Sequence, residues 1–139
     1  MGHAVSAVDR AFLRSFDACE VPPADFNHRA HLQLAYIMLA TYGVRQAGEK
    51  FRASLQAFLA HNHIDPAKYH ETMTQAWLLA VMYFMRRAGD TSSADEFVAS
   101  STVLLDPKVM FTHYSSELIR SDRARREFVE PDLDPIPRH

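Results

Sequence analysis

Residues 67–87 read AKYHETMTQAWLLAVMYFMRR, and this stretch says the most about the fold. Apolar side chains cover most of the circumference of the helix that it predicts, which is typical of a helix in the middle of a bundle. An imidazole and a carboxylate lie at its start, and most of its remaining residues are apolar. One stripe at helical spacing consists of His70, Thr74, Trp77, Val81 and Phe84. The segment therefore predicts a central helix whose start aims an imidazole into the core.

A second segment with the same design covers residues 26–43, FNHRAHLQLAYIMLATYG. Asn27 is a good N-cap and Gly43 a good helix stop, so we expect a helix from His28 to Tyr42. His28 and His31 lie three residues apart and share a face with the apolar residues that come after them. Both histidines are thus expected to point inward, where polar groups must be hydrogen-bonded, metal-bound or used in chemistry.

The rest of the chain predicts further helices and a tail. An amphipathic helix over 5–18 has Val5, Val8, Phe12 and Phe16 on one stripe. We expect another helix over 45–60, a shorter one capped by Ser93 with Glu96 completing a capping box, and short helices after Asp106 and Ser121. Residues 130–139 contain three prolines and should be extended. The prediction is an all-α bundle of about four longer helices, forming a single domain over 1–139.

Composition excludes several classes of partner. The 139 residues carry a net charge of −2, so no bulk attraction to nucleic acid or to an anionic membrane is expected. No stretch approaches the ~20 apolar residues of a membrane span. The single cysteine, Cys19, excludes an internal disulfide and fits a reducing compartment. A cytoplasmic protein is expected.

The histidines at the two helix starts suggest a metal site. We take His28, His31 and His70 as candidate ligands, with Glu71 as a further ligand or an orienting group and His113 as a weaker candidate. Imidazole and carboxylate ligands suit zinc, iron or copper, so a divalent transition metal is the expected cofactor. The spacing matches neither the two histidines four apart of zincins nor the repeated Glu-x-x-His of di-iron bundles.

Three interpretations of this site stay open: a metal centre, a metal-free catalytic or ligand-binding pocket, and histidines with a structural role alone. In the first two, His70, Glu71 and Thr74 are the candidate catalytic residues, and Trp77 and Tyr36 help to shape the pocket. The positive ends of the two helices favour an anionic small-molecule substrate. The leading hypothesis is a small metal-dependent enzyme. The alternative is a non-catalytic module that binds a small molecule or a protein.

One basic cluster of the sequence is explained without a binding site. Arg123, Arg125 and Arg126 are balanced by Glu127 and Glu130, so a solvated helix face or ion pairs with the acidic tail explain them.

Three segments of the chain, FNHRAHLQLAYIML, KYHETMTQAW and SSELIRSDRARREFVEPDLDP, resemble a group of short bacterial all-helical proteins. The shared pattern is an aromatic-x-His-x-x-His start, then Tyr-His-Glu-Thr-x-Thr, a Tyr-Ser segment and a Phe-Val-x-Pro-Asp ending. It is matched here by His28, His31, His70, Glu71, Thr72, Thr74, Tyr114, Phe128, Pro131 and Asp132. The resemblance implies one domain with a shared His/Glu site, and His113 is outside the pattern.

Overall fold

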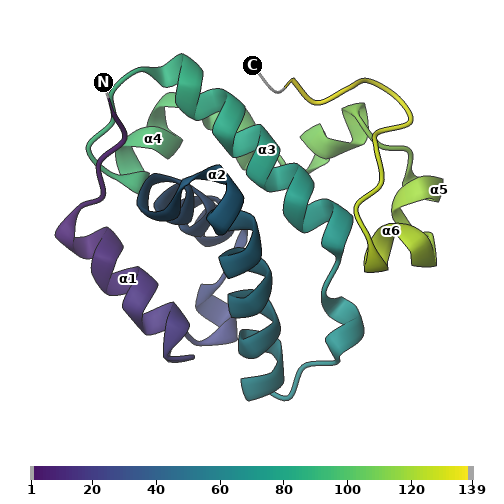
Figure 1. Cartoon of the computed structure of the whole chain (residues 1–139), viewed down its shortest axis with the longest axis horizontal. Coiled ribbons are helices and arrows are strands. Elements are labelled where there is room, and N and C mark those ends of the chain that lie inside the picture. The colour runs from purple at the N-terminus through teal and green to yellow at the C-terminus, as the bar shows by residue number, and fades with distance from the viewer. Residues whose placement is uncertain (1, 138–139) are drawn as a thin grey trace.

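The computed structural model describes residues 2–137 and consists of helices joined by short loops (Figure 1). Within that range there is no strand, only an isolated bridge between His3 and Thr91. The all-α prediction is confirmed. The α-helices are α1 (Ala7–Asp17), α2 (His28–His61), α3 (Glu71–Ala88), α4 (Ala94–Ser100), α5 (Ser116–Ile119) and α6 (Asp122–Arg126). Short 3-10 helices are η1 (Pro23–Asp25), η2 (Pro66–Lys68), η3 (Thr102–Leu105) and η4 (Pro107–Thr112).

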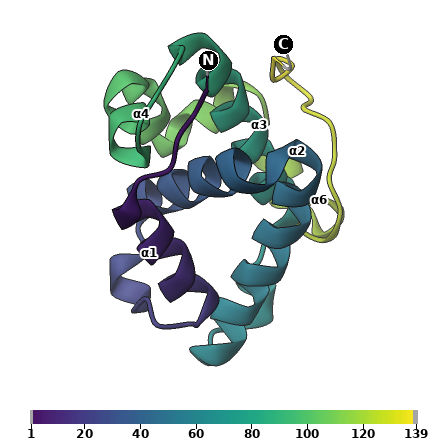
Figure 2. The same ribbon diagram turned by 60° about the vertical axis from the view of Figure 1, so that its left-hand side comes forward.

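Helix α2 is bent into two arms at Gly43, which has φ 81° and ψ 169°. This left-handed backbone conformation favours glycine, because a side chain there is strained. The two arms correspond to the separate helices predicted over 28–42 and 45–60, and they run in different directions (Figure 2). Helix α3 packs along α2, and this is the most extensive helix pair of the molecule.

Local capping signals set most helix boundaries. The side chain of Asn27 accepts a hydrogen bond from the amide of Ala30, as expected of an N-cap. Ser93 caps α4 in the same way, but the carboxylate of Glu96 accepts from the amide of Ser92, so the predicted box is only half formed. Helix α5, capped by Ser115, is not among the predicted elements.

The stripe predicted for α1 is confirmed at Phe16, Phe12 and Val5, which pack in or against the core, but is wrong at Val8. Val8 is 75% exposed, whereas Asp9, Leu13 and Phe16 are buried. The polar Asp9 is inside because its carboxylate accepts hydrogen bonds from the amides of Ser6 and Ala94. The bond from Ser6 belongs to the cap of α1, and the bond from Ala94 ties α1 to the start of α4.

The C-terminal third is fastened to α3 by buried polar contacts. Thr72 donates its hydroxyl to the carbonyl of Glu127 at 2.9 Å and accepts from the amide of Val129 at 3.1 Å. The hydroxyl of Tyr114 also bonds the carbonyl of Val129, at 2.7 Å. The tail bends at 132–134 and buries Ile136, so it packs on the domain instead of extending freely. Its last two residues lie outside the described part of the chain.

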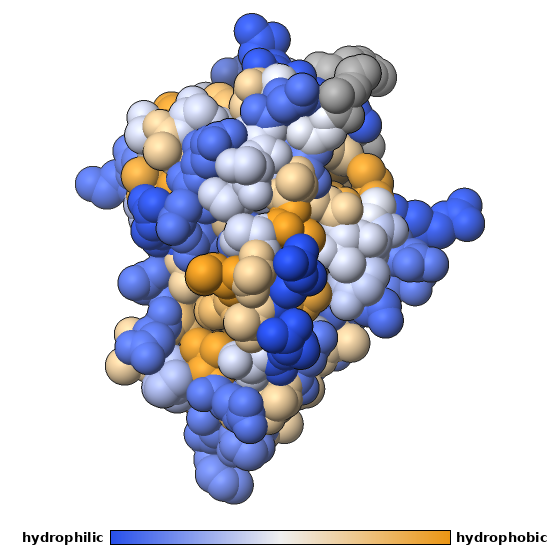
Figure 3. Space-filling view, turned by 90° about the vertical axis from the view of Figure 1, so that its left-hand side faces the viewer, coloured by the Kyte–Doolittle hydropathy of each residue, from blue (hydrophilic) through white to orange (hydrophobic). Residues whose placement is uncertain are grey.

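Hydrophilic and apolar side chains both form the surface. Hydrophilic residues surround a smaller apolar area on the face shown in Figure 3. Among the helices of residues 2–137, none has the length and apolar character needed to cross a membrane.

Candidate functional site

The structure brings the three predicted histidines to one depression of about 360 Å³, between the starts of α2 and α3 and the last turns of α2. We call it the histidine hollow. Its lining residues are Phe26, Asn27, His28, His31, Leu55, Phe58, Leu59, Lys68, Tyr69, His70, Met73, Thr74 and Trp77. Residues far apart in sequence meet here because the second arm of α2 returns the chain to the end from which α2 began.

His70 is the N-cap of α3, and both of its ring nitrogens are occupied. Nδ1 accepts a hydrogen bond from the amide of Met73 at 3.2 Å, while Nε2 lies 2.8 Å from the carbonyl oxygen of Ile119. A carbonyl only accepts and an amide only donates, so the proton must be on Nε2. This cap also corrects the predicted helix start: α3 begins at Glu71, and residues 66–68 form the separate helix η2.

His28 is likewise bonded to the C-terminal third of the chain. Its Nε2 lies 2.8 Å from the carbonyl oxygen of Leu104, which fixes Nε2 as the donor. Its ring meets the indole of Trp77 edge-on, with centroids 4.7 Å apart. His28 and His70 thus each use an imidazole to hold a distant carbonyl.

His31 differs from the other two histidines. Its ring lies 5.8 Å from that of Phe26 and 5.0 Å from that of Phe51, in an apolar setting. Its Nδ1 is buried and has no hydrogen-bond partner among the described residues. Burial lowers the pKa of His31 to about 4, and repulsion by His28 adds to the effect. The ring is therefore neutral at pH 7.

Thr74 and Trp77 line the hollow as predicted, and each is 5% exposed. Tyr36 does not: its hydroxyl bonds the carbonyl of Ala4 and the hydroxyl of Thr91, next to the N-terminal segment. His113 lies on another surface depression, where its Nδ1 bonds the carbonyl of Asp134 at 2.8 Å.

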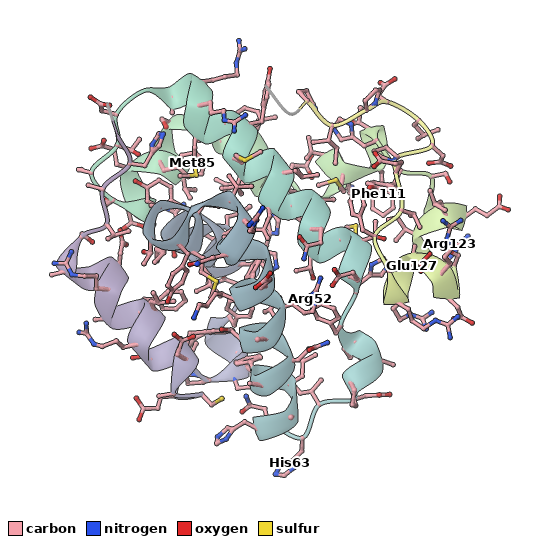
Figure 4. All side chains as sticks on the ribbon, in the orientation of Figure 1. Arg52, His63, Met85, Phe111, Arg123 and Glu127 are labelled. Atoms are coloured by element: carbon pink, nitrogen blue, oxygen red, sulfur yellow. The ribbon has the colours of Figure 1, made fainter. Side chains whose placement is uncertain are left out.

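Glu71 is separated from the histidines. Its carboxylate forms a two-pronged ion pair with the guanidinium of Arg52, through Nε at 3.0 Å and through Nη2, and it also accepts from the hydroxyl of Tyr69. Burial alone raises the pKa of Glu71, but the hydrogen bonds from Arg52 and Tyr69 hold it below its ordinary value. In Figure 4, Arg52 projects from α2 towards the start of α3.

No sequence signal marked Arg52, because the two partners are 19 residues apart and on different helices. The same ion pair raises the pKa of Arg52. Glu71 lines the depressions on either side of the pair and not the histidine hollow, so the predicted His/Glu site is divided in two.

Metal ligation by the histidines stays a prediction. No group of three or more His, Cys, Asp or Glu side chains within residues 2–137 is arranged to hold a metal ion. His70 would have to release either the amide of Met73 or the carbonyl of Ile119 before it could ligate one. His28 has its Nε2 in use, which leaves only Nδ1 for a metal.

Comparisons of the chain with known protein families, with curated proteins and with solved structures found no match. A function for this chain is therefore inferred from the geometry of its own residues.

Proposed function

We propose that the protein is a small-molecule-binding helical module, and that the histidine hollow is its binding site. One observation carries the proposal: His31 lines the hollow with a buried, unpartnered ring nitrogen, whereas His28 and His70 are bonded to backbone carbonyls. An unpaired buried polar atom costs about 1–3 kcal/mol, and natural proteins keep few of them. The free cysteine, Cys19, supports a cytoplasmic location for this activity.

The lining defines the kind of ligand. Phe26, Phe58 and Trp77 supply aromatic walls, and the volume of about 360 Å³ is near the lower end of the range for ligand pockets. Lys68 is among the lining residues, and its positive charge favours a carboxylate. The neutral ring of His31 can donate or accept one hydrogen bond. These features suit a small aromatic or aliphatic carboxylic acid.

A catalytic role for this hollow is a separate proposal from binding. With a pKa of about 4, His31 is a weak base at neutral pH, and general bases work best when their pKa is near the operating pH. His70 and Thr74 line the same hollow and stay candidates for catalysis, with or without a metal. A binding function needs no change in the positions or bonds of these side chains, so it is the function that the geometry supports best.

Trp77 provides a direct test, because it is the only tryptophan of the chain and lines the hollow. Its fluorescence should change and saturate when purified protein is titrated with benzoate, phenylacetate or hexanoate. Matched neutral alcohols should bind less tightly, because they lack the charge that Lys68 attracts. Turnover of any acid that binds is then measured by mass spectrometry.

The variant His31→Leu keeps the apolar volume but removes the ring nitrogens, so it should weaken binding by about tenfold. His61→Leu is the matched control, since His61 is exposed at the end of α2. The proposal is overturned if no acid changes the fluorescence of the folded protein, or if both variants bind like the wild type.

A further inference from the structure

A larger depression, of about 760 Å³, lies on the other side of Tyr69 from the histidine hollow. It is formed by the second arm of α2, by η2 and by α6 with the residue pair directly after it. Three arginines line it: Arg52 from α2, and Arg125 and Arg126 from α6. We call it the arginine hollow. Two of these arginines belong to the basic run for which the sequence predicted no site.

The three arginines of the arginine hollow differ in how fully they are paired with carboxylates. Arg52 uses Nε and Nη2 for Glu71, which leaves Nη1 outside that ion pair. Arg125 pairs with Asp122 at 3.1 Å, but Asp122 is 72% exposed, and exposed pairs of this kind contribute little. Arg126 forms no ion pair with any described residue.

The acidic residues of the hollow are already paired. The carboxylate of Glu71 is held by Arg52, and that of Glu127 accepts from Nε of Arg123 at 2.7 Å. Figure 4 shows Arg123 and Glu127 together at α6. With both carboxylates paired, Arg125 and Arg126 keep a positive potential in the hollow.

Aromatic and apolar groups accompany this charge. The ring of Tyr69 is held in place because its hydroxyl donates to Glu71, and Phe128 and Leu59 supply further apolar surface. Guanidinium groups bind phosphate through paired hydrogen bonds and also stack on planar groups. The combination suits a ligand with a dianionic head and a planar body.

We infer that the arginine hollow binds a small aromatic phosphomonoester, with the phosphate between Arg125 and Arg126 and the ring against Tyr69 and Phe128. Nη1 of Arg52 is the third donor. This site is separate from the acid-binding hollow proposed above and does not depend on it, although Tyr69 and Leu59 line both.

Isothermal titration calorimetry with phenyl phosphate tests the inference. We expect saturable binding that weakens as salt is added, because the contacts are charged. Arg125→Gln and Arg126→Gln should each weaken binding by at least about tenfold. Arg120→Gln is the control: it makes the same charge change at an exposed residue between α5 and α6, outside the hollow, and should bind within about twofold of the wild type.

Two further titrations complete the test. Inorganic phosphate should bind more weakly than phenyl phosphate, because it lacks the ring, and phenol should not bind. His31→Leu should leave phenyl phosphate binding unchanged, so failure at one hollow is distinguishable from failure at the other. The inference is overturned if the folded protein does not bind phenyl phosphate, if Arg120→Gln weakens binding as much as Arg126→Gln, or if inorganic phosphate binds equally well.

Discussion

His70 lies with its Nε2 2.8 Å from the carbonyl oxygen of Ile119, a residue 49 positions later in the chain. The same ring caps α3 through Nδ1 and the amide of Met73. One imidazole therefore starts the central helix and also attaches the end of α5 to it. This dual bond gives His70 a structural role whether or not it also takes part in chemistry.

Replacement of His70 should measure that role. We expect His70→Ala to lower the free energy of unfolding by about 2 kcal/mol, because it removes an N-cap and a second hydrogen bond. His70→Asn should recover about half of the loss, since asparagine caps helices well but is too short to reach Ile119. Urea denaturation followed by circular dichroism gives both values. A change below about 0.5 kcal/mol in His70→Ala would contradict this assignment.

His31 should make stability depend on pH. In the unfolded chain its pKa returns to about 6.5, whereas in the folded protein it is about 4. Between these values the unfolded state binds more protons, so stability is complete above pH 6.5 and falls as the pH is lowered towards 4. The difference between the two pKa values corresponds to about 3 kcal/mol in the free energy of unfolding.

The pH dependence of the urea midpoint, compared between wild type and His31→Leu, isolates this contribution. The variant should lose less stability than the wild type does between about pH 6.5 and about pH 4.5. His61→Leu, a change at an exposed position outside the hollow, is the matched control. Parallel curves for wild type and His31→Leu would show that His31 does not titrate in this way.

Trp77 is a core residue as well as a wall of the histidine hollow. It is 5% exposed and contacts the ring of His28. Trp77→Ala should therefore cost about 3–5 kcal/mol, and Trp77→Phe clearly less, because a phenyl ring fills part of the space. Far-ultraviolet circular dichroism during urea denaturation measures both. A loss below ~1 kcal/mol for Trp77→Ala would assign Trp77 to the pocket wall alone.

Metal content separates the remaining hypotheses about the histidines. Since His70 has both nitrogens bonded to the backbone and His28 has one, we expect less than about 0.1 equivalent of zinc, iron or copper per chain. Elemental analysis before and after dialysis against a chelator checks this. One equivalent of metal that is lost in His31→Leu would restore the metal centre and require a rotated His70.

Much of the fold could be predicted from neighbouring residues. Asn27 and Ser93 each mark a helix start and Gly43 marks the bend of α2, because a short polar side chain or a missing Cβ acts on the backbone within three or four residues of itself. The stripe through Trp77 and Val81 is buried as its spacing predicts. These signals are local, so they can be read without knowing where the chain goes next.

The site could be predicted only in part. His28, His31 and His70 line one hollow, as expected from their places at two helix starts. What each ring does there depends on distant atoms: the carbonyls of Leu104 and Ile119 occupy two of them. Val8 was wrongly placed in the core for a similar reason, since Asp9 is buried by its bond to the distant amide of Ala94.

Sequence alone was enough to predict the longer helices, the break at Gly43 and the position of the histidines at two helix starts, because caps, glycines and apolar spacing act over a few residues. Tertiary packing was needed to show that Glu71 pairs with Arg52, that His31 keeps an unpartnered nitrogen in its hollow, and that Arg125 and Arg126 line another. Ion pairs and hydrogen bonds between distant residues depend on directions and distances of a few ångströms, which exist only once the helices have packed.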